Sequence, residues 1–563
     1  MKYLLLKSGL ALLLCFLTTN SIAQKTDAFN ESNIYEGIEF SMPKVKTTNF
    51  LDYEVSISDF GAVKGGVIKN TDAFTKAINF VASKGGGKVI VPRGIWLTGP
   101  ITLKSNINLH LEEGSLIVFS KDFDDYKIIK TSYEGLNAYR CISPINANGV
   151  ENVGITGNGI IDGGGDAWRP INRNQITSAH WEKLVSQGGV LSEDGKTWLP
   201  SEKAKKGFEK KINYTTTTTI NDSELNSIKD FLRPVMVSIV NSKRVLLDGP
   251  TFQNSPAWNL HPLMCEDVII RNCKIRNTYY SQNGDGLDLE SCNNALVYNN
   301  TFDVGDDAIC IKSGKDKDGR DRGIPTKNVI VKNNVVYRGH GGFVIGSEMS
   351  GGINNVHVSN CTFIGTDIGL RFKSTRGRGG IVENIYISNI DMIQIAADAI
   401  SFNMYYFSKR PAFYDSGTYE TNNQEEPLVA ITEETPSFRN IFMKNIMVCE
   451  SGIAAFFMGL PEMNLKNVSL ENSVFQTKKG ITTIDSEGLA LSNVKIIASD
   501  DYALTLYNTK KVKTNDLMFN ESKSAIRILG SKSVDIQFNK RDFPNANDIL
   551  ISKKVEKNSV KIK

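Results

Sequence analysis

The chain has 563 residues, of which 40% are hydrophobic and 22% are charged, with 47 glycines and 16 prolines. This is an ordinary globular composition, and it excludes a collagen-like, mucin-like or intrinsically disordered chain. The formal net charge is +4, from 65 Lys and Arg against 61 Asp and Glu, so nothing indicates general binding of nucleic acid. Attraction to an acidic substrate would have to come from the local placement of cations.

Residues 1–23 have the pattern of an export signal. Lys2 and Lys7 precede an apolar run over residues 10–17, and Ser21-Ile22-Ala23 supplies a small-x-small cleavage site. The apolar run is shorter than the roughly 20 residues that a membrane-spanning helix needs, and no later stretch is long enough. We therefore expect cleavage after Ala23, no membrane span, and a periplasmic or secreted protein.

A lead segment over residues 24–52 is followed by a helical pattern at the start of the region 53–120. Apolar residues recur at helical spacing after Asn70-Thr71-Asp72, namely Phe74, Ala77, Ile78 and Val81. This pattern predicts a capped amphipathic helix, and the runs at 89–92 and 107–111 predict strands. An apolar helix over the open end is the cap that a repeat fold requires.

From about residue 149 one phrase recurs: Asn or Asp, alternating aliphatic residues, another Asn and a short polar turn. Copies begin at Asn152, Asp267, Asn328, Asn355, Asn384, Asn440, Asn467 and Asn493. Counted between first aliphatic residues from Val268, with Ala295 in the next copy, the intervals are 27, 34, 27, 29, 56, 27 and 26 residues. Asn suits such corners because it tolerates left-handed backbone and its amide can pair with the Asn of the next repeat.

This period predicts a solenoid or a propeller, and a propeller would need four strands in some 40 to 50 residues. Each repeat holds two or three β-prone runs, and no repeat shows a helical pattern. We therefore predict an all-β fold, a right-handed parallel β-helix with an N-terminal capping helix, formed as a single domain by residues 53–563.

Two polar stretches interrupt the repeats, at 166–235 and at about 408–437. The first contains a pattern for a short helix near residues 178–185. Long insertions into a solenoid either form walls around a groove or decorate the surface, and the sequence leaves both alternatives open.

Four short motifs with chemical potential lie between residues 283 and 373. They are Asn283-Gly284-Asp285, Gly305-Asp306-Asp307, Gly339-His340-Gly341-Gly342 and Arg371-Phe372-Lys373. Each follows the first aliphatic residue of its repeat at a similar distance, so stacking of the repeats should bring them to one face. Three carboxylates held together repel one another, so at least one should keep its proton near neutral pH.

An acid opposite an ionised carboxylate is the arrangement that glycoside hydrolysis requires. The Arg-x-Lys pair alternates to one side of a strand, where two cations would suit a substrate that bears carboxylates.

These motifs resemble those of glycoside hydrolase family 28, the polygalacturonases and their relatives, in which Asn-x-Asp, Gly-Asp-Asp, Gly-His-Gly and Arg-x-Lys occur in this order. The resemblance implies that Asp306 is the general acid, that Asp285 and Asp307 position and activate water, and that His340 supports them. It also implies substrate binding by Asn283, Arg371 and Lys373, and no metal or other cofactor.

Two further assignments follow from position. The family uses a tyrosine about one coil beyond the Arg-x-Lys pair, which matches Tyr405 or Tyr406, and we prefer Tyr405. His261, near Trp258, lies one coil before Asp285 and is assigned to the other side of the substrate, while core packing is an equal alternative for Trp258. Asp288 departs from the family pattern and is assigned no chemistry.

The resemblance implies an exported hydrolase that cleaves α-1,4-linked galacturonic acid in pectin with inversion, and a carboxyl separation of about 6.5–9.5 Å. Exo action is favoured because the 166–235 insertion could close one end of a groove. The alternatives are a hydrolase of rhamnogalacturonan or other branched pectin in the same family, and a non-catalytic glycan-binding β-helix. We expect a monomer whose partner is a pectic polysaccharide or oligogalacturonide.

Overall fold

The computed structural model describes residues 31–563 except 211–217, 409–427, 500–501, 520–524 and 543–548. The expected signal peptide and most of the second expected insertion lie outside the described residues. Within the described ranges, none of the helices has both the length and the apolar character needed to cross a membrane. The chain divides into a unit that ends at Ile38, with a 3₁₀ helix at Glu31–Tyr35, and a unit from Glu39 to Lys563.

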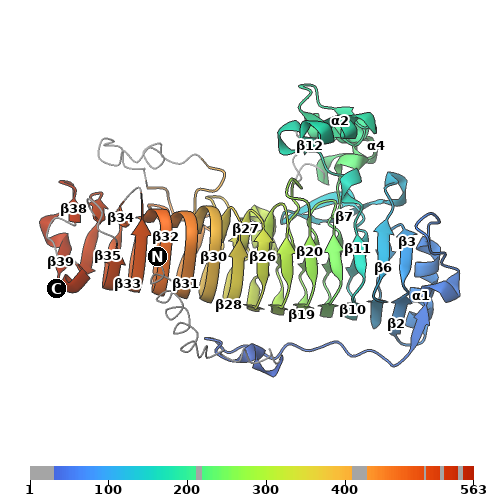
Figure 1. The fold of residues 1–563 in the computed structure, drawn as a ribbon, viewed down its shortest axis with the longest axis horizontal. Helices are drawn as coiled ribbons and strands as arrows, with labels where there is room; N and C mark the ends of the chain where they lie inside the picture. The colour runs from blue at the N-terminus through green and yellow to red at the C-terminus, as the bar shows by residue number, and fades with distance from the viewer. Residues whose placement is uncertain (1–30, 211–217, 409–427, 500–501, 520–524, 543–548) are drawn as a thin grey trace, which may run out of the picture. The chain divides into compact units, whose positions relative to one another are not determined.

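The second unit is a right-handed parallel β-helix (Figure 1), which confirms the predicted fold class. Within the described residues its main sheet has 34 strands, each paired in parallel with the strand at the same position of a neighbouring coil. Inward side chains from three faces fill one continuous hydrophobic core.

The bounds of the strands follow face by face. After β1 (Glu54–Ser56), the first face consists of β2 (Gly87–Val91), β5 (Ile107–Leu111), β10 (Glu151–Gly157), β16 (Lys243–Asp248), β19 (Glu266–Arg271), β22 (Asn293–Tyr298), β25 (Thr326–Lys332) and β28 (Ile353–Ile364). The second face consists of β3 (Gly94–Thr98), β6 (Ser115–Phe119), β11 (Ile160–Asp162), β17 (Thr251–Gln253), β20 (Lys274–Arg276), β23 (Thr301–Asp303) and β26 (Val335–Arg338).

The third face, which positions the candidate site, consists of β4 (Ile101–Thr102), β9 (Ile145–Asn148), β15 (Val237–Val240), β18 (Leu260–Leu263), β21 (Leu287–Glu290), β24 (Asp307–Lys312), β27 (Gly341–Gly346) and β29 (Ile368–Lys373). The later coils are formed by β30 (Ile381–Asn403), β31 (Ser437–Met458), β32 (Leu465–Ile484), β33 (Ser486–Ala498), β34 (Leu504–Tyr507), β35 (Lys510–Phe519), β36 (Ile526–Leu529), β37 (Val534–Phe538), β38 (Ile549–Ile551) and β39 (Val560–Ile562).

The register confirms the repeat alignment except at its last copy. Val268 pairs with Ala295, and the matching aliphatic residues pair onward through Val468. Val468 then pairs with Leu489, while Val494 pairs with Ser473. The copy at Asn493 is misaligned because the preceding coil has two Asn corners, Asn467 and Asn472, whereas in this coil the first corner is Gly488 and Asn493 stacks on Asn472.

Asparagine stacking at the corners has the expected geometry. Asn440 and Asn467 have φ angles of 54° and 53°, in the left-handed region. The amide of Asn467 donates to Oδ1 of Asn440 at 3.0 Å, and Asn440 donates in turn to Asn384 at 3.3 Å. These side chains therefore satisfy polar groups at corners where the backbone ladder is interrupted.

Helix α1 (Thr71–Ser83) covers the N-terminal end of the coil and buries the four apolar residues of the predicted stripe. Asn70 precedes it but makes no side-chain cap; its amide instead donates to Leu97 O at 3.1 Å and accepts from Val63 N at 2.6 Å. Within the repeats, α5 (Asp316–Arg322) lies between β24 and β25. The expectation that no repeat contains a helix was therefore wrong at this coil.

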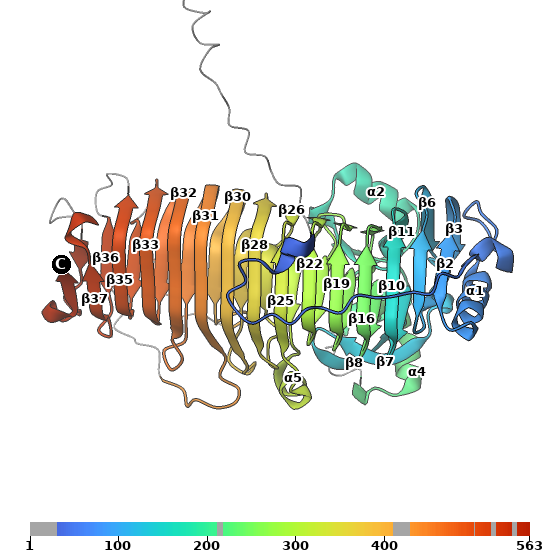
Figure 2. The ribbon, with the colours of Figure 1, turned by 90° about the horizontal axis from the view of Figure 1, so that it is seen from below.

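Residues 39–53 cross the first face as an extended segment (Figure 2). The carboxylate of Glu39 lies 2.6 Å from Nδ1 of His357 on β28, and Asn49 N donates to Asn152 on β10 at 2.8 Å. The described part of the lead segment thus crosses several coils on the first face, whereas the predicted motifs lie along the third face.

The first insertion folds as its own small layer of short elements: β12 (Ile171–Asn172), α2 (Ser178–Ser186), β13 (Val190–Leu191), β14 (Thr197–Leu199), α3 (Glu202–Glu209) and α4 (Asp222–Ser227). Helix α2 confirms the short helix predicted near 178–185. The Tyr279 hydroxyl donates to Gln175 O at 2.8 Å, and Tyr280 packs against the cluster of Ile171, Trp181 and Trp198. The insertion therefore contacts the loop that leads to Asp285. A separate hairpin, β7 (Ile128–Tyr133) with β8 (Leu136–Cys141), precedes β9.

Candidate active site

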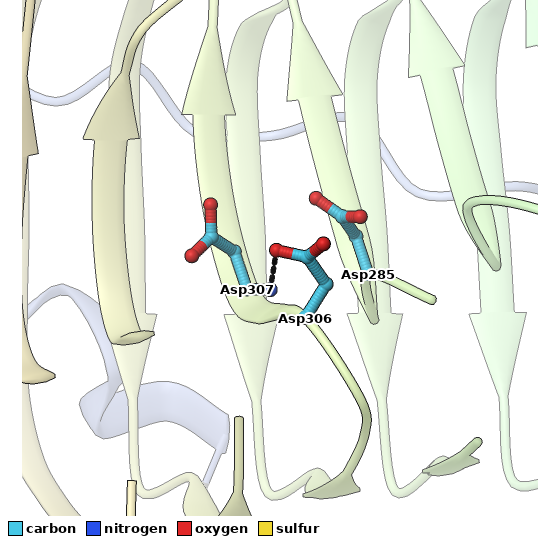
Figure 3. Close-up of side chains that lie close together, drawn as sticks. All are labelled: Asp285, Asp306 and Asp307. Atoms are coloured by element: carbon cyan, nitrogen blue, oxygen red, sulfur yellow. Dashed lines mark hydrogen bonds between the residues drawn. The ribbon is translucent and has the colours of Figure 1, made fainter. Parts of the chain in front are cut away.

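Three aspartates meet at the start of neighbouring strands of the third face (Figure 3). Leu287 of β21 pairs with Ile309 of β24, and Gly286 N donates to Asp307 O at 2.9 Å, so Asp285 and Asp307 lie at the same level. One carboxylate oxygen of Asp285, of Asp306 and of Asp307 lies within 4.8 Å of the others.

These separations are shorter than the expected 6.5–9.5 Å. The reason is that in-register neighbours on parallel strands are held at the strand spacing of about 4.8 Å. Oxygen atoms at this spacing could bridge a hard cation. The cations that contact the cluster in the structure are the side chains of Arg371 and Lys373, both against Asp307.

Asp306 is the most exposed of the three, with 21% of its side chain accessible. Its Oδ1 accepts from Asp307 N at 3.0 Å and lies 3.1 Å from Nδ1 of His340. His340 N also donates to Asp306 O at 2.9 Å, which fixes the two residues side by side. Because Oδ1 is engaged by both partners, Oδ2 is the oxygen available to hold a transferable proton.

His340 lies half exposed beside this carboxylate. Its hydrogen bond to Asp306 raises the pKa of the imidazole, and this effect outweighs burial, which alone would lower the pKa. A protonated His340 donates from Nδ1 and adds positive charge at the edge of the carboxylate cluster.

Asp307 is almost fully buried and pairs with both members of the Arg-x-Lys motif. Its Oδ2 lies 2.5 Å from Nζ of Lys373, and its Oδ1 lies 3.3 Å from Nη1 of Arg371. Burial alone would raise the pKa of Asp307, but the charges of Lys373, Arg371 and Lys312 lower the pKa to about 2. The two cations predicted to bind a substrate carboxylate therefore contact the aspartate cluster itself. Arg371 keeps 19% of its side chain exposed and has further donors to offer.

Of the two candidate tyrosines, the structure places Tyr406 beside these cations. Its ring centroid lies 5.6 Å from Cζ of Arg371 and 5.0 Å from Nζ of Lys373. Tyr405 is 2% exposed and faces Arg376 at 5.1 Å instead. The preference for Tyr405 is therefore corrected to Tyr406, because Tyr405 has no surface to offer a substrate.

Asp285 is buried, and its Oδ1 accepts no hydrogen bond from the described residues. Burial, followed by the charges of Asp288 and Asp306, raises the pKa of Asp285 well above its usual value. Asp285 and Asp307 thus have pKa values shifted in opposite directions, the pattern of groups with different proton-transfer roles.

A buried ionic network behind the cluster was missed by sequence reasoning. Nζ of Lys312 lies 2.7 Å from Glu348 Oε2, 3.4 Å from Asp288 Oδ1 and 4.5 Å from the ring centroid of Trp258. Burial raises the pKa of Asp288 well above its usual value. The sequence pattern that could have indicated this network is the presence of a charged residue within each of two neighbouring strands, Asp288 on β21 and Lys312 on β24.

His261 is placed differently from the prediction. It is 1% exposed, and its Nε2 lies 2.9 Å from Glu290 Oε2, whose other oxygen accepts from Arg322. Trp258 is 2% exposed and stacks on Tyr133 with ring centroids 5.2 Å apart. The assignment of His261 to the substrate is therefore corrected: it belongs to a buried ion-pair cluster that has no free surface.

Asn283 lies two residues before Asp285 with a φ of 53°, in the left-handed region. It is half-buried, and its Oδ1 accepts from Nη2 of Arg233 at 3.1 Å. The predicted substrate-binding asparagine is thus anchored by the last residues of the insertion, a partner that sequence reasoning did not anticipate.

Comparison with known proteins gives consistent matches. The sequence-family model for "Glycosyl hydrolases family 28" matches residues 232–450 of this chain. A "Probable polygalacturonase" of Vitis vinifera is 27% identical over 477 residues, covering 82% of each chain. An "Exo-poly-alpha-D-galacturonosidase" of Dickeya chrysanthemi is 27% identical over 72% of this chain and 67% of its own. The crystal structure of a hyperthermoactive exopolygalacturonase from Thermotoga maritima is 30% identical, with a TM-score of 0.64, over 85% of this chain and 94% of its own.

Proposed function

The chain belongs to Glycosyl hydrolases family 28, and from this premise we propose that it hydrolyses α-1,4-linked galacturonic acid in pectin. The observation that carries the proposal is the cluster of three aspartates with Arg371 and Lys373 against one of them. Carboxyl groups supply acid and base, and cations at the same place favour a substrate that bears carboxylates.

Asp306 is proposed as the general acid. Its side chain is 21% exposed, and its Oδ2, which accepts no hydrogen bond from the described residues, is proposed to carry the proton that goes to the departing glycosidic oxygen. His340 and the backbone N–H of Asp307 hold Oδ1 and stabilise the carboxylate that forms when the proton leaves.

Asp285 and Asp307 are proposed to hold and deprotonate the attacking water. Burial and the charges of Asp288 and Asp306 favour the protonated form of Asp285, whereas Lys373 and Arg371 favour the ionised form of Asp307, so the pair is suited to donate one hydrogen bond to water and accept another. A substrate carboxylate that draws on Arg371 and Lys373 would weaken their hold on Asp307 and make it a stronger base. Water then attacks the anomeric carbon from the face opposite the leaving group, with inversion.

Exo action and export complete the proposal. The insertion packs on the loop before Asp285 through Tyr279 and Tyr280, which supports a site closed on that side. Two of the relatives described above are named as exo-acting enzymes. Residues 1–23 are proposed to be removed during export to the periplasm or the medium.

The test is hydrolysis of polygalacturonate followed by the release of reducing ends. Asp306→Asn should lower the rate about 10²- to 10⁴-fold, because the proton donor is lost. Asp303→Asn lies on the same coil as Asp306 and removes a surface ion pair with Arg338 of the next coil; it is the matched control and should keep the wild-type rate. Equal rates for wild type and Asp306→Asn would contradict the proposal.

The product profile separates the remaining alternatives. Galacturonate monomer alone indicates exo action, and a ladder of oligomers indicates endo action. Faster cleavage of rhamnogalacturonan than of polygalacturonate would identify a branched-pectin hydrolase instead.

A further inference from the structure

A buried arginine at the end of the first insertion holds the candidate substrate-binding asparagine. Arg233 is 5% exposed, and its Nη1 donates to Pro256 O at 3.0 Å and to Gln282 O at 3.1 Å. Its Nη2 donates to Asn283 Oδ1 at 3.1 Å. Two of these hydrogen bonds tie the guanidinium to the loop that leads into Asp285, and the third ties it to the segment before β18.

This contact sets the orientation of the Asn283 amide. A guanidinium donates hydrogen bonds and accepts none, so the amide oxygen must face Arg233 and the NH₂ group must point away. Nδ2 of Asn283 bonds to no described residue, and it is absent from the buried polar atoms without a partner. The NH₂ group is therefore open to solvent as a donor.

No direct ion pair balances the charge of Arg233, although Asp230, whose buried Oδ1 has no hydrogen-bond partner among the described residues, lines the same cavity. Within the described ranges, no carboxylate lies within ion-pair distance of its guanidinium. Asp230 lines the same small cavity of about 160 Å³, but its Oδ2 accepts from Ser201 at 2.6 Å. A buried cation without a counterion is costly, and an anion that reaches Asn283 would offset part of that cost.

Asn283 and the Arg-x-Lys pair lie on opposite sides of the proposed acid. Asn283 precedes β21, while Arg371 and Lys373 lie on β29, three strand pairings further along the third face through β24 and β27. A substrate that spans Asp306 would present one sugar to Arg371 and Lys373 and the other sugar to Asn283.

We propose that Arg233 is a positioning residue, supplied by the insertion, that turns the Asn283 NH₂ group toward the carboxylate of the sugar on the glycone side of the cleaved bond. The inference rests on the proposed function, because it needs a uronate on that side. The insertion would then contribute to recognition of the sugar's charge as well as to the wall beside the site.

The experiment compares KM and kcat for digalacturonate, which has a single glycosidic bond, with an analogue whose glycone carboxyl is reduced to an alcohol. Arg233→Met should raise KM for digalacturonate about 10- to 100-fold, the loss expected for a hydrogen bond to a charged group. For the neutral analogue, KM should change less than about twofold by the same reasoning. Arg233→Lys, which restores a donor and a positive charge, should recover part of the affinity for digalacturonate.

Two further variants distinguish a positioning role of Arg233 from a general disturbance of the structure. Asn283→Gly removes the amide, suits the left-handed φ of 53° at this position and leaves the Arg233 side chain unaltered, and it should reproduce the selective rise in KM. Tyr279→Phe removes the contact with Gln175 without touching Asn283, and it should leave the ratio of the two KM values unchanged. A rise in KM that is equal for both sugars, or no effect of Asn283→Gly, would overturn the inference.

A binding experiment tests the role of Arg233 even if the proposed hydrolysis does not occur. If the wild type releases no reducing ends from polygalacturonate, calorimetry of free galacturonate and of galactose with wild type and Arg233→Met replaces the kinetics. Weaker binding of galacturonate alone in Arg233→Met would then support the positioning role, and equal binding by both proteins would overturn it.

Discussion

The ammonium group of Lys373 lies 2.5 Å from Oδ2 of Asp307, with both side chains almost fully buried. Burial opposes the charge on Asp307, so the ionised carboxylate depends on Lys373, Arg371 and Lys312, which together bring its pKa to about 2. Because this folded-state pKa is lowered, the stability contributed by ionised Asp307 is present above the unfolded pKa of about 3.9 and is lost as pH falls through about 2.

Lys373→Met should therefore impair catalysis on the acid side. Removing the closest cation lets burial act, and the pKa of Asp307 should rise by about 1–3 units. The acid limb of kcat/KM for polygalacturonate should move to higher pH by at least about one unit, and kcat should fall. The measurement is a pH–rate profile. Lys274→Met, at an exposed position on β20, is the control. An unmoved acid limb in Lys373→Met would show that Asp307 does not act as proposed.

His340 should make a contribution to stability that depends on pH. Its folded-state pKa is raised, chiefly by the hydrogen bond to Asp306, so the stabilisation is fully present below the unfolded pKa of about 6.5 and is lost as pH rises through the folded value. The difference in Tm between wild type and His340→Gln should be larger near pH 5.5 than near pH 8.5. Thermal unfolding at both pH values measures it, and a difference that grows toward pH 8.5 would contradict the assignment.

Lys312 should be essential for stability rather than for contact with substrate. Its charge lies 2.7 Å from Glu348 and 3.4 Å from Asp288, all three side chains being buried or nearly so. Lys312→Met should lower the free energy of unfolding by about 3–5 kcal/mol, since carboxylates would be left without their cation. Adding Glu348→Gln should restore part of the loss, as measured by denaturant unfolding at neutral pH. Additive losses in the double variant would mean that the two charges are not coupled.

The fold and the carboxylate cluster could be predicted because both depend on the spacing of one repeat. Once Val268, Ala295 and Val329 are stacked, Asp306 and His340 must lie side by side, each 11 residues after its own aliphatic anchor. The copy at Asn493 shows the limit of this reasoning, because Gly488 occupies the first corner of its coil and the remaining Asn belongs to the second corner.

The remaining residues depended on what covers the strands. His261 and Lys312 occupy outward strand positions that the pattern assigns to solvent, and only folded neighbours such as Arg322 of α5 enclose them. Tyr405 and Tyr406 are adjacent, so the side to which each points changes with a one-residue shift in where β30 ends. Arg233 lies in an insertion whose contacts no repeat could predict.

The stereochemistry of the product tests how the closely spaced carboxyl groups work. Separations within 4.8 Å are nearer to the roughly 5–5.5 Å of enzymes that retain configuration through a covalent intermediate than to the range for inversion. However, Asp307 is paired with two cations, and burial together with the charges of Asp288 and Asp306 favours the protonated form of Asp285, so neither carboxyl is a ready nucleophile. We therefore expect inversion, with β-galacturonate as the first product from the α-linked chain. Proton NMR of the anomeric signals during the first minutes of hydrolysis, before mutarotation mixes them, measures this directly, and initial α-galacturonate would instead assign Asp307 or Asp285 a covalent role.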